Sequence, residues 1–388
     1  MSTFAKGLEG VVAAETRMSF IDGEKGILEY VGIPIDALAR NSTFEETVFL
    51  LWNCRLPKKA ELVDFSAQIR SRYALPGDFR KRILDMPKDA QPMHVLRTAV
   101  SSLSLYDPNP NATDVPTARE KALNILAQTP TIVAWFDRHR RGLPLVEPRS
   151  DLSFAANFLY MLNGKEPTPA MVRAFDICMI LHADHGLNNS TFTARVIIST
   201  LSDMYSALTG AIGSLRGPLH GGANEEVMEM LNEIEAFAKQ QGKDTSAVIE
   251  PYIMDKLARR HEGARIMGFG HRVYKTIDPR ATFLKTFSKQ IAADTGNLKL
   301  YEMSSKIEEI MAREVGAKGI YPNVDFYSAT TYHSIGLKLD LFTPMFAMSR
   351  ISGWAGHCIE QLADNRLFRP KANYIGPHEA PYVPMDQR

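Results

Sequence analysis

A histidine lies in a glycine-rich turn at residues 217–224, where a proline ends one helical pattern and an amphipathic pattern begins. We expect His220 to lie just before the N-terminus of a helix. Free N–H groups and the positive end of the helix dipole there disfavour a protonated imidazole. Gly221 and Gly222 leave open backbone beside the ring, so that a ligand can come close. A neutral His220 suits a hydrogen bond to a substrate oxygen that gains negative charge, and the simpler alternative is a plain helix–helix connection.

The same combination recurs at Gly268-Phe269-Gly270-His271, where two glycines precede a second histidine. No third glycine and no βαβ pattern follows, so this is not a dinucleotide-binding fingerprint. Three cations flank the open backbone: Arg265, Arg272 and Lys275. Cations beside exposed backbone favour a phosphate-rich ligand, and a basic surface loop is the alternative.

Asp325 lies between apolar and aromatic residues in the stretch from Tyr321 to Ala329. A partly desolvated carboxylate is more basic than usual and suits a general base, although the same residue could cap the helix that follows. Arg350 and Arg369 also lie in apolar surroundings. A buried guanidinium needs an anionic partner, and a carboxylate ligand matches its forked geometry.

His182 and His185 extend an apolar pattern of three- and four-residue steps, which predicts that both share one helix face up to Gly186. A metal site, a hydrogen-bonded core pair and substrate binding are the alternatives. No third ligand at metal-binding spacing accompanies the pair, because Asp184 points elsewhere on a helix. We therefore expect no metal, and substrate binding is the favoured interpretation.

The elements that must position these residues are mostly helical. Residues 7–33 combine glycines with alternating apolar patches, and Asp22-Gly23 predicts a hairpin in a short β-ribbon. From Pro34 onward the apolar period is that of helices. The pattern predicts a helix over 117–134 with a bend or break at Pro130, one over 191–214, and others over 223–238, 245–262, 280–293 and 302–316.

Composition limits the kinds of partner. The 388 residues contain 45 lysines and arginines against 44 aspartates and glutamates, so no overall positive field attracts nucleic acid or anionic lipid. No run of about 18 uncharged apolar residues predicts a membrane span. Cys54, Cys178 and Cys358 are isolated in apolar patterns, which predicts buried, reduced thiols in a cytoplasmic protein.

Taken in order, the motifs Gly217–Gly221, Gly268–Arg272 with Asp278-Pro279-Arg280, and Pro322–Asp325 closely resemble the citrate synthase family. His182–His185 with Asn188-Asn189-Ser190 fits as well, and the resemblance extends over nearly the whole chain. It implies an all-α fold with a large multi-helix domain (1–222 and 332–388), a smaller helical domain (223–331) that closes over a cleft, and a short N-terminal β-ribbon. Closure would exclude water from the reacting groups.

The resemblance also implies roles. Asp325 would remove a proton from the methyl group of acetyl-CoA while His220 stabilises the enolate. His271 would polarise and protonate the carbonyl of oxaloacetate, and citryl-CoA would then be hydrolysed. The dicarboxylate would be held by His185, Arg280, Arg350 and, from the other subunit, Arg369. CoA, bound as substrate and product, would contact Arg265, Ile266, Gly268, Gly270, Arg272, Lys275 and Lys318.

Other implications concern assembly and identity. The resemblance implies a homodimer, and a hexamer or larger assembly fits as well; no permanently bound cofactor, nucleic acid or membrane partner is expected. The nearest rival activity is 2-methylcitrate synthesis from propionyl-CoA with the same residues. An inactive helical scaffold that only self-assembles is a rival of another class, although all motif residues are present.

Overall fold

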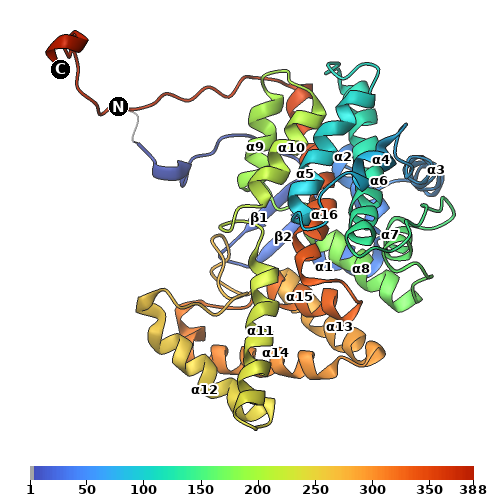
Figure 1. Cartoon of the computed structure of the whole chain (residues 1–388), viewed down its shortest axis with the longest axis vertical. Coiled ribbons are helices and arrows are strands. Elements are labelled where there is room, and N and C mark those ends of the chain that lie inside the picture. The colour runs from blue at the N-terminus through green and yellow to red at the C-terminus, as the bar shows by residue number, and fades with distance from the viewer. Residues whose placement is uncertain (1–3) are drawn as a thin grey trace.

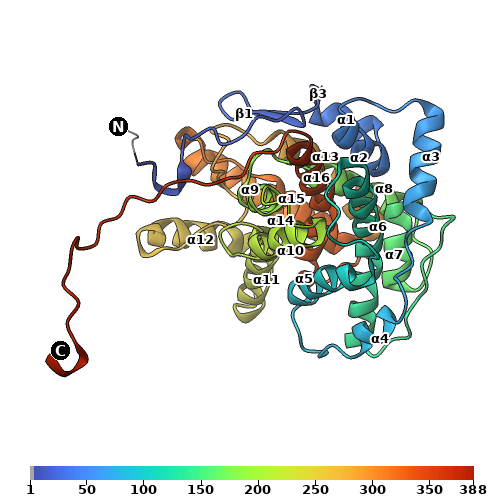
Figure 2. The same ribbon diagram turned by 90° about the horizontal axis from the view of Figure 1, so that it is seen from above.

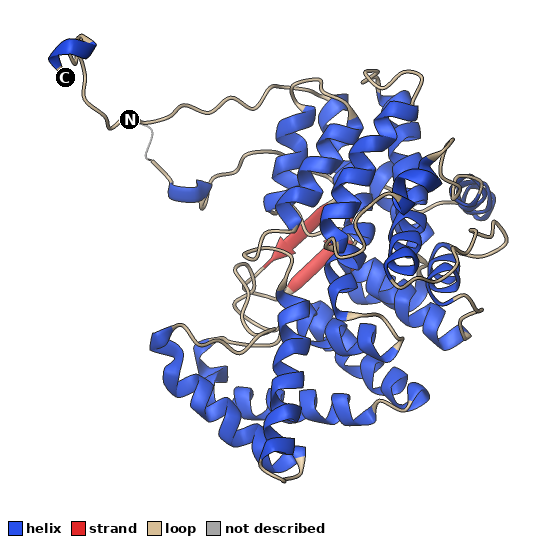
Figure 3. Cartoon of the chain, viewed as in Figure 1, coloured by secondary structure: helices blue, strands red, loops and turns tan. Residues whose placement is uncertain are grey.

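The computed structural model describes residues 4–388 and shows an all-α protein with one small sheet. Helices dominate Figure 3, and the strands lie together in one small sheet, which Figure 2 shows at an outer edge of the molecule. The antiparallel sheet has the order β1 (Ser19–Asp22), β2 (Ile27–Tyr30), β3 (Ile33–Pro34). Ile21 pairs with Leu28 across the hairpin, which confirms the ribbon predicted around Asp22-Gly23.

The upper body in Figure 1 is built around α16 (Phe342–Ala363), a helix that is buried along almost its whole length. A helix that is apolar on all sides belongs in the centre of a core. The helices around it are α1 (Ile35–Asn41), α2 (Phe44–Asn53), α3 (Lys59–Arg70), α4 (Phe79–Leu84), α5 (Pro92–Leu103), α6 (Val115–Arg140), α7 (Phe154–Asn163), α8 (Pro169–His182), α9 (Asn189–Ile198) and α10 (Met204–Leu215).

The remaining helices gather in the lower part of Figure 1. They are α11 (Ala223–Gln240), α12 (Thr245–Ala258), α13 (Pro279–Thr295), α14 (Leu298–Val315) and α15 (Val324–Ser334). α13 and α15 pack against each other and also against α8 of the upper body. The division of the chain at 223 and 331 remains a prediction.

Two predicted helices differ from the structure. α6 passes through Pro130 without a break, because Pro130 and the residues next to it are buried and packing in the core holds the helix across the missing donor. The helix predicted over 191–214 is divided between α9 and α10. Asp203 is the N-cap of α10 and accepts a hydrogen bond from the amide of Ser206 (2.8 Å). The small residues on both sides of Asp203 make the segment look like one continuous helix in the sequence.

α8 ends at His182, so the prediction that His182 and His185 share a helix face is wrong. Beyond this helix, the hydroxyl of Tyr30 satisfies the backbone of Asp184 in place of helical partners. It donates to the carbonyl of Asp184 (2.8 Å) and accepts from the amide of the same residue (3.1 Å). Asp184 also pairs with His357 of α16, with 3.2 Å between Oδ1 and Nε2. Tyr30 and His357 therefore hold Asp184 in place, and this fixes the loop that carries His185.

Gly353 allows this loop to lie directly against α16. Its amide donates to the carbonyl of Ala183 (3.1 Å), and a Cβ at this position would lie 2.4 Å from the same oxygen. A side chain cannot be accommodated at that distance without moving backbone. The absence of a side chain at Gly353 thus sets how close the segment that carries His185 comes to the central helix.

The N-terminal segment from residue 4 and the C-terminal segment after Pro370 extend away from the body, as Figures 1 and 2 show. The C-terminal segment after Pro370 exposes large apolar side chains, among them Ile375 (91% exposed) and Tyr382 (81% exposed). Cys178 and Cys358 are buried as predicted, but Cys54 is exposed because it follows the last turn of α2. Within residues 4–388, no helix is both long and apolar enough to cross a membrane.

Candidate active site

His220 lies in the turn between α10 and α11, as predicted. Its Nε2 atom accepts from the amide of Ser190 (3.3 Å) and lies 2.8 Å from the hydroxyl of the same residue. With Nε2 as acceptor, the ring hydrogen of the neutral form is on Nδ1. Burial and, to a smaller extent, the charge of Arg350 together lower the pKa of His220 to about 4. The ring is therefore a neutral donor at neutral pH.

His271 is held as the opposite tautomer. Its Nδ1 atom accepts from the amides of Val273 (3.0 Å) and Tyr274 (3.2 Å), so the hydrogen of the neutral ring is on Nε2. Burial lowers the pKa of His271 to about 4, and the charge of Arg280 contributes. The two histidines therefore offer N–H donors through different ring atoms.

The loop that carries His271 is paired with the segment that leads into α15. The amide of Gly270 donates to the carbonyl of Tyr321 (2.8 Å), and the amide of Asn323 donates to the carbonyl of Gly268 (2.9 Å). Gly268 has a positive φ of 77°, and a Cβ there would lie 2.8 Å from Cβ of Phe326. This backbone pairing, which needs glycine, brings His271 close to the start of the helix that carries Asp325.

Asp325 lies in the first turn of α15. The alternative that it caps this helix is wrong, because Asn323 is the N-cap and accepts from the amide of Asp325 (3.0 Å). Burial raises the pKa of Asp325 to about 6, although the nearby charges of Arg280 and Arg350 oppose this. A carboxylate with a pKa near 6 is ionised at neutral pH and is more basic than an exposed aspartate.

Arg280 is buried at the start of α13, where its Nε and Nη2 atoms donate to the two carboxylate oxygens of Asp278 (3.0 and 2.7 Å). Asp278 also accepts from the amide of Val324 (3.2 Å). This carboxylate therefore joins the start of α13 to the start of α15. It fixes the guanidinium of Arg280 near Asp325 and leaves the Nη1 atom of Arg280 for another partner.

Arg350 is also buried (2% exposed), and no carboxylate among residues 4–388 forms a direct ion pair with it. Its Nε atom donates to the carbonyl of His182 (2.6 Å), and its guanidinium lies 4.7 Å from the ring centroid of Phe346. Burial lowers the pKa of Arg350 to about 10, although the more distant charges of Asp184 and Asp325 oppose this. A buried cation without a direct ion pair is costly, so this one is suited to receive an anionic ligand.

His185 completes the group. Its ring centroid lies 5.3 Å from that of His271, and its Nε2 atom lies 3.1 Å from the hydroxyl oxygen of Tyr274. Burial holds the pKa of His185 well below its usual range, and the charges of Arg280, His271 and Arg350 add to this effect. The structure thus brings six side chains close together: His185, His220, His271, Arg280, Asp325 and Arg350.

His182 is not part of this group but a core residue. Its Nδ1 atom lies 2.8 Å from the carbonyl of Cys178, and its ring packs edge-on against Phe346. Within the described residues, 4–388, no cluster of three or more histidine, cysteine or acidic side chains could hold a metal ion.

The cations predicted to meet CoA lie outside the buried group. Arg265, Arg272, Lys275 and Lys318 are all exposed. A Cβ on Gly319 would lie 3.0 Å from the carbonyl oxygen of Lys275, so Lys318 and Lys275 belong to neighbouring segments. Ile266 and Gly268 are buried, and Gly270 is partly exposed.

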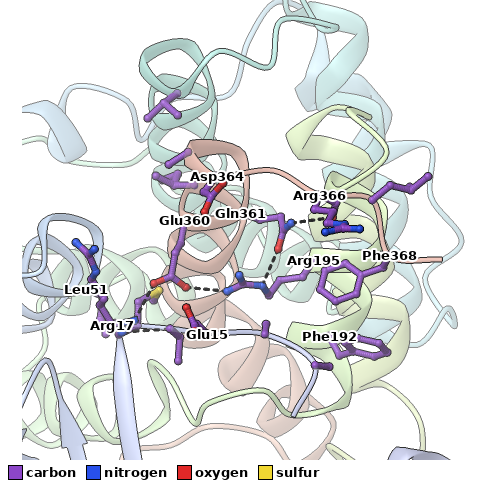
Figure 4. Close-up of a pocket in the computed structure, with 18 of the residues that line it drawn as sticks. Glu15, Arg17, Leu51, Phe192, Arg195, Glu360, Gln361, Asp364, Arg366 and Phe368 are labelled. Carbon is purple, nitrogen blue, oxygen red and sulfur yellow. Dashed lines mark hydrogen bonds and ion pairs between the residues drawn. The ribbon is translucent and has the colours of Figure 1, made fainter. Parts of the chain in front are cut away.

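Arg369 is far from this arrangement in its own chain. It lines a separate cavity of about 1550 Å³ between the N-terminal segment and the segment after α16. Figure 4 shows this cavity, where Arg195 donates to Glu360 (2.7 Å) and Gln361 (3.1 Å) and Phe192 faces Phe368. None of the buried histidines at 185, 220 and 271 lines it.

Sequence reasoning gave no role to two residues that orient the site. Ser190 contacts His220 and receives a hydrogen bond from Trp354 Nε1 (3.0 Å), and Tyr274 contacts His185. Neither had a distinguishing pattern, since each is a single polar residue within a motif whose histidine or glycines are more conspicuous. Only the tertiary contacts identify them.

Comparisons with known proteins agree with the geometry. The family model described as "Citrate synthase, C-terminal domain" matches residues 7–371. The chain is 48% identical to a citrate synthase of Deinococcus radiodurans and 49% identical to citrate synthase 2 of Bacillus subtilis, with complete coverage of both chains in each case. A crystal structure of citrate synthase from Pyrobaculum aerophilum aligns with a TM-score of 0.89 at 41% identity, covering 99% of this chain and 95% of that one.

A ternary complex of a Thermoplasma acidophilum citrate synthase with carboxymethyl coenzyme A and oxaloacetate aligns with a TM-score of 0.90 at 34% identity, covering both chains completely.

The raised pKa of Asp325 predicts a pH-dependent cost in stability. The folded chain keeps the proton up to a pH of about 6, whereas the unfolded chain loses it near 3.8, so ionisation above pH 4 progressively disfavours the folded state. Asp325→Asn removes this cost. We expect its melting temperature at pH 7.5 to exceed that of the wild type by about 2–6 °C, with less than half of the difference left at pH 4.5.

Scanning calorimetry at the two pH values measures this, with Asp64→Asn as a control for the loss of an exposed carboxylate outside the site. A variant that is no more stable than the wild type at pH 7.5 would contradict the account of Asp325.

Proposed function

This chain belongs to the citrate synthase family, and from that premise we propose that it condenses acetyl-CoA with oxaloacetate to give citrate and CoA. Asp325 takes a proton from the methyl group of acetyl-CoA, and the resulting carbon nucleophile attacks the ketone carbon of oxaloacetate. The new carbon–carbon bond gives citryl-CoA. Water then cleaves the thioester, which releases citrate and the CoA thiol.

The observation that carries this proposal is that the buried charge of Arg350, beside the neutral histidines, has no direct ion pair among residues 4–388. A guanidinium that is 2% exposed and lacks a carboxylate partner within residues 4–388 is matched to an anion. The Nη1 atom of Arg280 forms no hydrogen bond within residues 4–388 and lies nearby. The remaining N–H groups of the two guanidiniums suit the two carboxylates of oxaloacetate, and we assign His185 as a further donor to the same substrate.

The states of the other groups support their roles. A carboxylate with a pKa of about 6 is a competent base at neutral pH. His220 offers Nδ1–H to the thioester oxygen as it becomes an enolate, and His271 offers Nε2–H to the ketone oxygen as it becomes an alkoxide. Neutral donors of this kind stabilise charge that develops in the transition state, and each contributes roughly 3–4 kcal/mol.

We assign the phosphates of CoA to four exposed cations outside the buried side chains of the site: Arg265, Arg272, Lys275 and Lys318. The backbone of Ile266, Gly268 and Gly270 would lie along the CoA portion of acetyl-CoA. CoA enters as a substrate and leaves as a product. We place the reaction in the cytoplasm as the entry step of the tricarboxylic acid cycle.

We further propose that the active unit is a homodimer in which Arg369 reaches the site of the other subunit. Within one chain Arg369 lines a cavity that contains none of the assigned catalytic residues. The segment that follows it extends from the body and exposes Ile375 and Tyr382, as a chain that packs on a second copy would. An isologous dimer exchanges such segments symmetrically.

Release of the CoA thiol from acetyl-CoA and oxaloacetate tests the reaction. We expect activity in the wild type with acetyl-CoA preferred to propionyl-CoA. Asp325→Ala, His220→Ala and His271→Ala should each lower kcat by about 10²–10⁴-fold, since each removes a base or a donor used in the transition state.

The control is His333→Ala, an exposed histidine on the same helix as Asp325, which should retain near-normal kcat. Wild-type protein that releases no thiol, or a near-normal rate in any of the three variants with unchanged circular dichroism, would contradict the assignment.

Co-expression of two inactive subunits tests the role of Arg369. In a heterodimer of Arg369→Ala and Asp325→Asn chains, one site combines an intact Asp325 with the partner's intact arginine, and the other site has lost both. Random pairing gives heterodimers as half of the population, each with one working site, so about a quarter of wild-type activity is expected. No recovery above the two inactive homodimers would show that Arg369 does not act across subunits.

A further inference from the structure

The phenol of Tyr274 is the only side chain within residues 4–388 that hydrogen-bonds to the ring of His185, at 3.1 Å from Nε2. Tyr274 is 1% exposed, so water does not compete for this contact. Its ring also packs against both histidines, with centroid distances of 5.5 Å to His185 and 4.8 Å to His271. The hydroxyl is therefore aimed at His185 by close packing.

The two possible arrangements of hydrogens differ in which donor is left without a partner. If His185 donated from Nε2, the hydrogen of the buried phenol would have no acceptor among residues 4–388, which is costly for a buried donor. If the phenol donates instead, the bond is made and the remaining donor is Nδ1–H of His185, which is not among the buried atoms without a partner in residues 4–388. Nε2 is then the acceptor, and the hydrogen of the neutral imidazole lies on Nδ1.

We propose that Tyr274 is a positioning residue that fixes His185 as the Nδ1–H tautomer, so that the ring presents a donor rather than a lone pair to a carboxylate of oxaloacetate. This inference rests on the proposed function for the identity of the substrate. Within residues 4–388, Nδ1 of His185 forms no hydrogen bond to another residue, so this N–H can meet a ligand.

The same residue serves two histidines by separate means. The backbone amide of Tyr274 donates to Nδ1 of His271, while the side chain acts on His185. Replacing the phenol by a phenyl ring therefore changes the hydrogen bonding of His185 alone. It leaves the amide that orients His271 and the packing of the ring in place. The variant should therefore lose affinity for oxaloacetate while the catalytic role of His271 is kept.

Nitrogen NMR of protein labelled at histidine with ¹⁵N tests the tautomer without substrate or turnover. The signals of His185 are those missing in the His185→Asn variant. We expect a protonated Nδ1 and an unprotonated Nε2 in the wild type, and loss of this fixed pattern in Tyr274→Phe. A protonated Nε2 in the wild type, or an unchanged pattern in Tyr274→Phe, would overturn the proposal.

Steady-state kinetics supply the second readout. We expect Tyr274→Phe to raise KM for oxaloacetate about 10-fold while KM for acetyl-CoA and kcat stay within about three-fold. Tyr73→Phe is the matched control, because it removes another buried phenol remote from the site and should alter neither KM. An equal rise in both KM values, or no rise in either, would contradict a role for the phenol at His185.

Amide substitutions at His185 test the same atom independently of Tyr274. The side-chain amide of asparagine places its NH₂ near the position of Nδ1, whereas glutamine reaches toward that of Nε2. Calorimetric titration with oxaloacetate should therefore show at least 5-fold tighter binding by His185→Asn than by His185→Gln. Equal or tighter binding by His185→Gln would overturn the tautomer. Because the NMR result needs no activity, a protein that releases no thiol would refute the proposed reaction and leave the tautomer standing.

Discussion

The buried guanidinium of Arg350 is the constraint on which the site depends. Its charge lies inside the protein and forms no direct ion pair with a carboxylate among residues 4–388. A backbone carbonyl, the face of Phe346 and the more distant charges of Asp184 and Asp325 offset the loss of water only in part. Unpaired buried charge disfavours the folded chain until an anion binds. The same charge disfavours protonation of His185 and His220 and keeps Asp325 more acidic than burial alone would. One cation thus prepares both the substrate site and the protonation states around it.

The fold supplies this arrangement by bringing three chain segments to α16 and α15. Gly353 lets the His185 loop lie on the central helix, and Gly268 lets the His271 loop pair with the start of α15. Asp278 then joins α13 to the same helix start through the amide of Val324. Each connection uses backbone atoms, which gives short and specific contacts. The position of Asp325 among the arginines follows from these connections.

The sequence was informative where local chemistry determines the structure. The hairpin at Asp22-Gly23, the turn that carries His220 and the glycines before His271 could all be predicted, and the motif order indicated the family. It failed where tertiary contacts decide. Tyr30 ends α8 before His185, and core packing carries α6 through Pro130; neither effect has a local pattern. Tyr274 and Ser190 likewise acquire meaning only from the side chains they meet.

Oxaloacetate binding to Arg350→Gln is the most direct test of the claim that this buried charge holds the substrate. Removal of a charge-assisted, forked interaction should weaken binding at least about 100-fold by titration calorimetry. Without substrate, the variant should melt no lower than the wild type, because it no longer buries an unpaired charge. An affinity within three-fold of the wild type, or a marked loss of stability without substrate, would contradict the account.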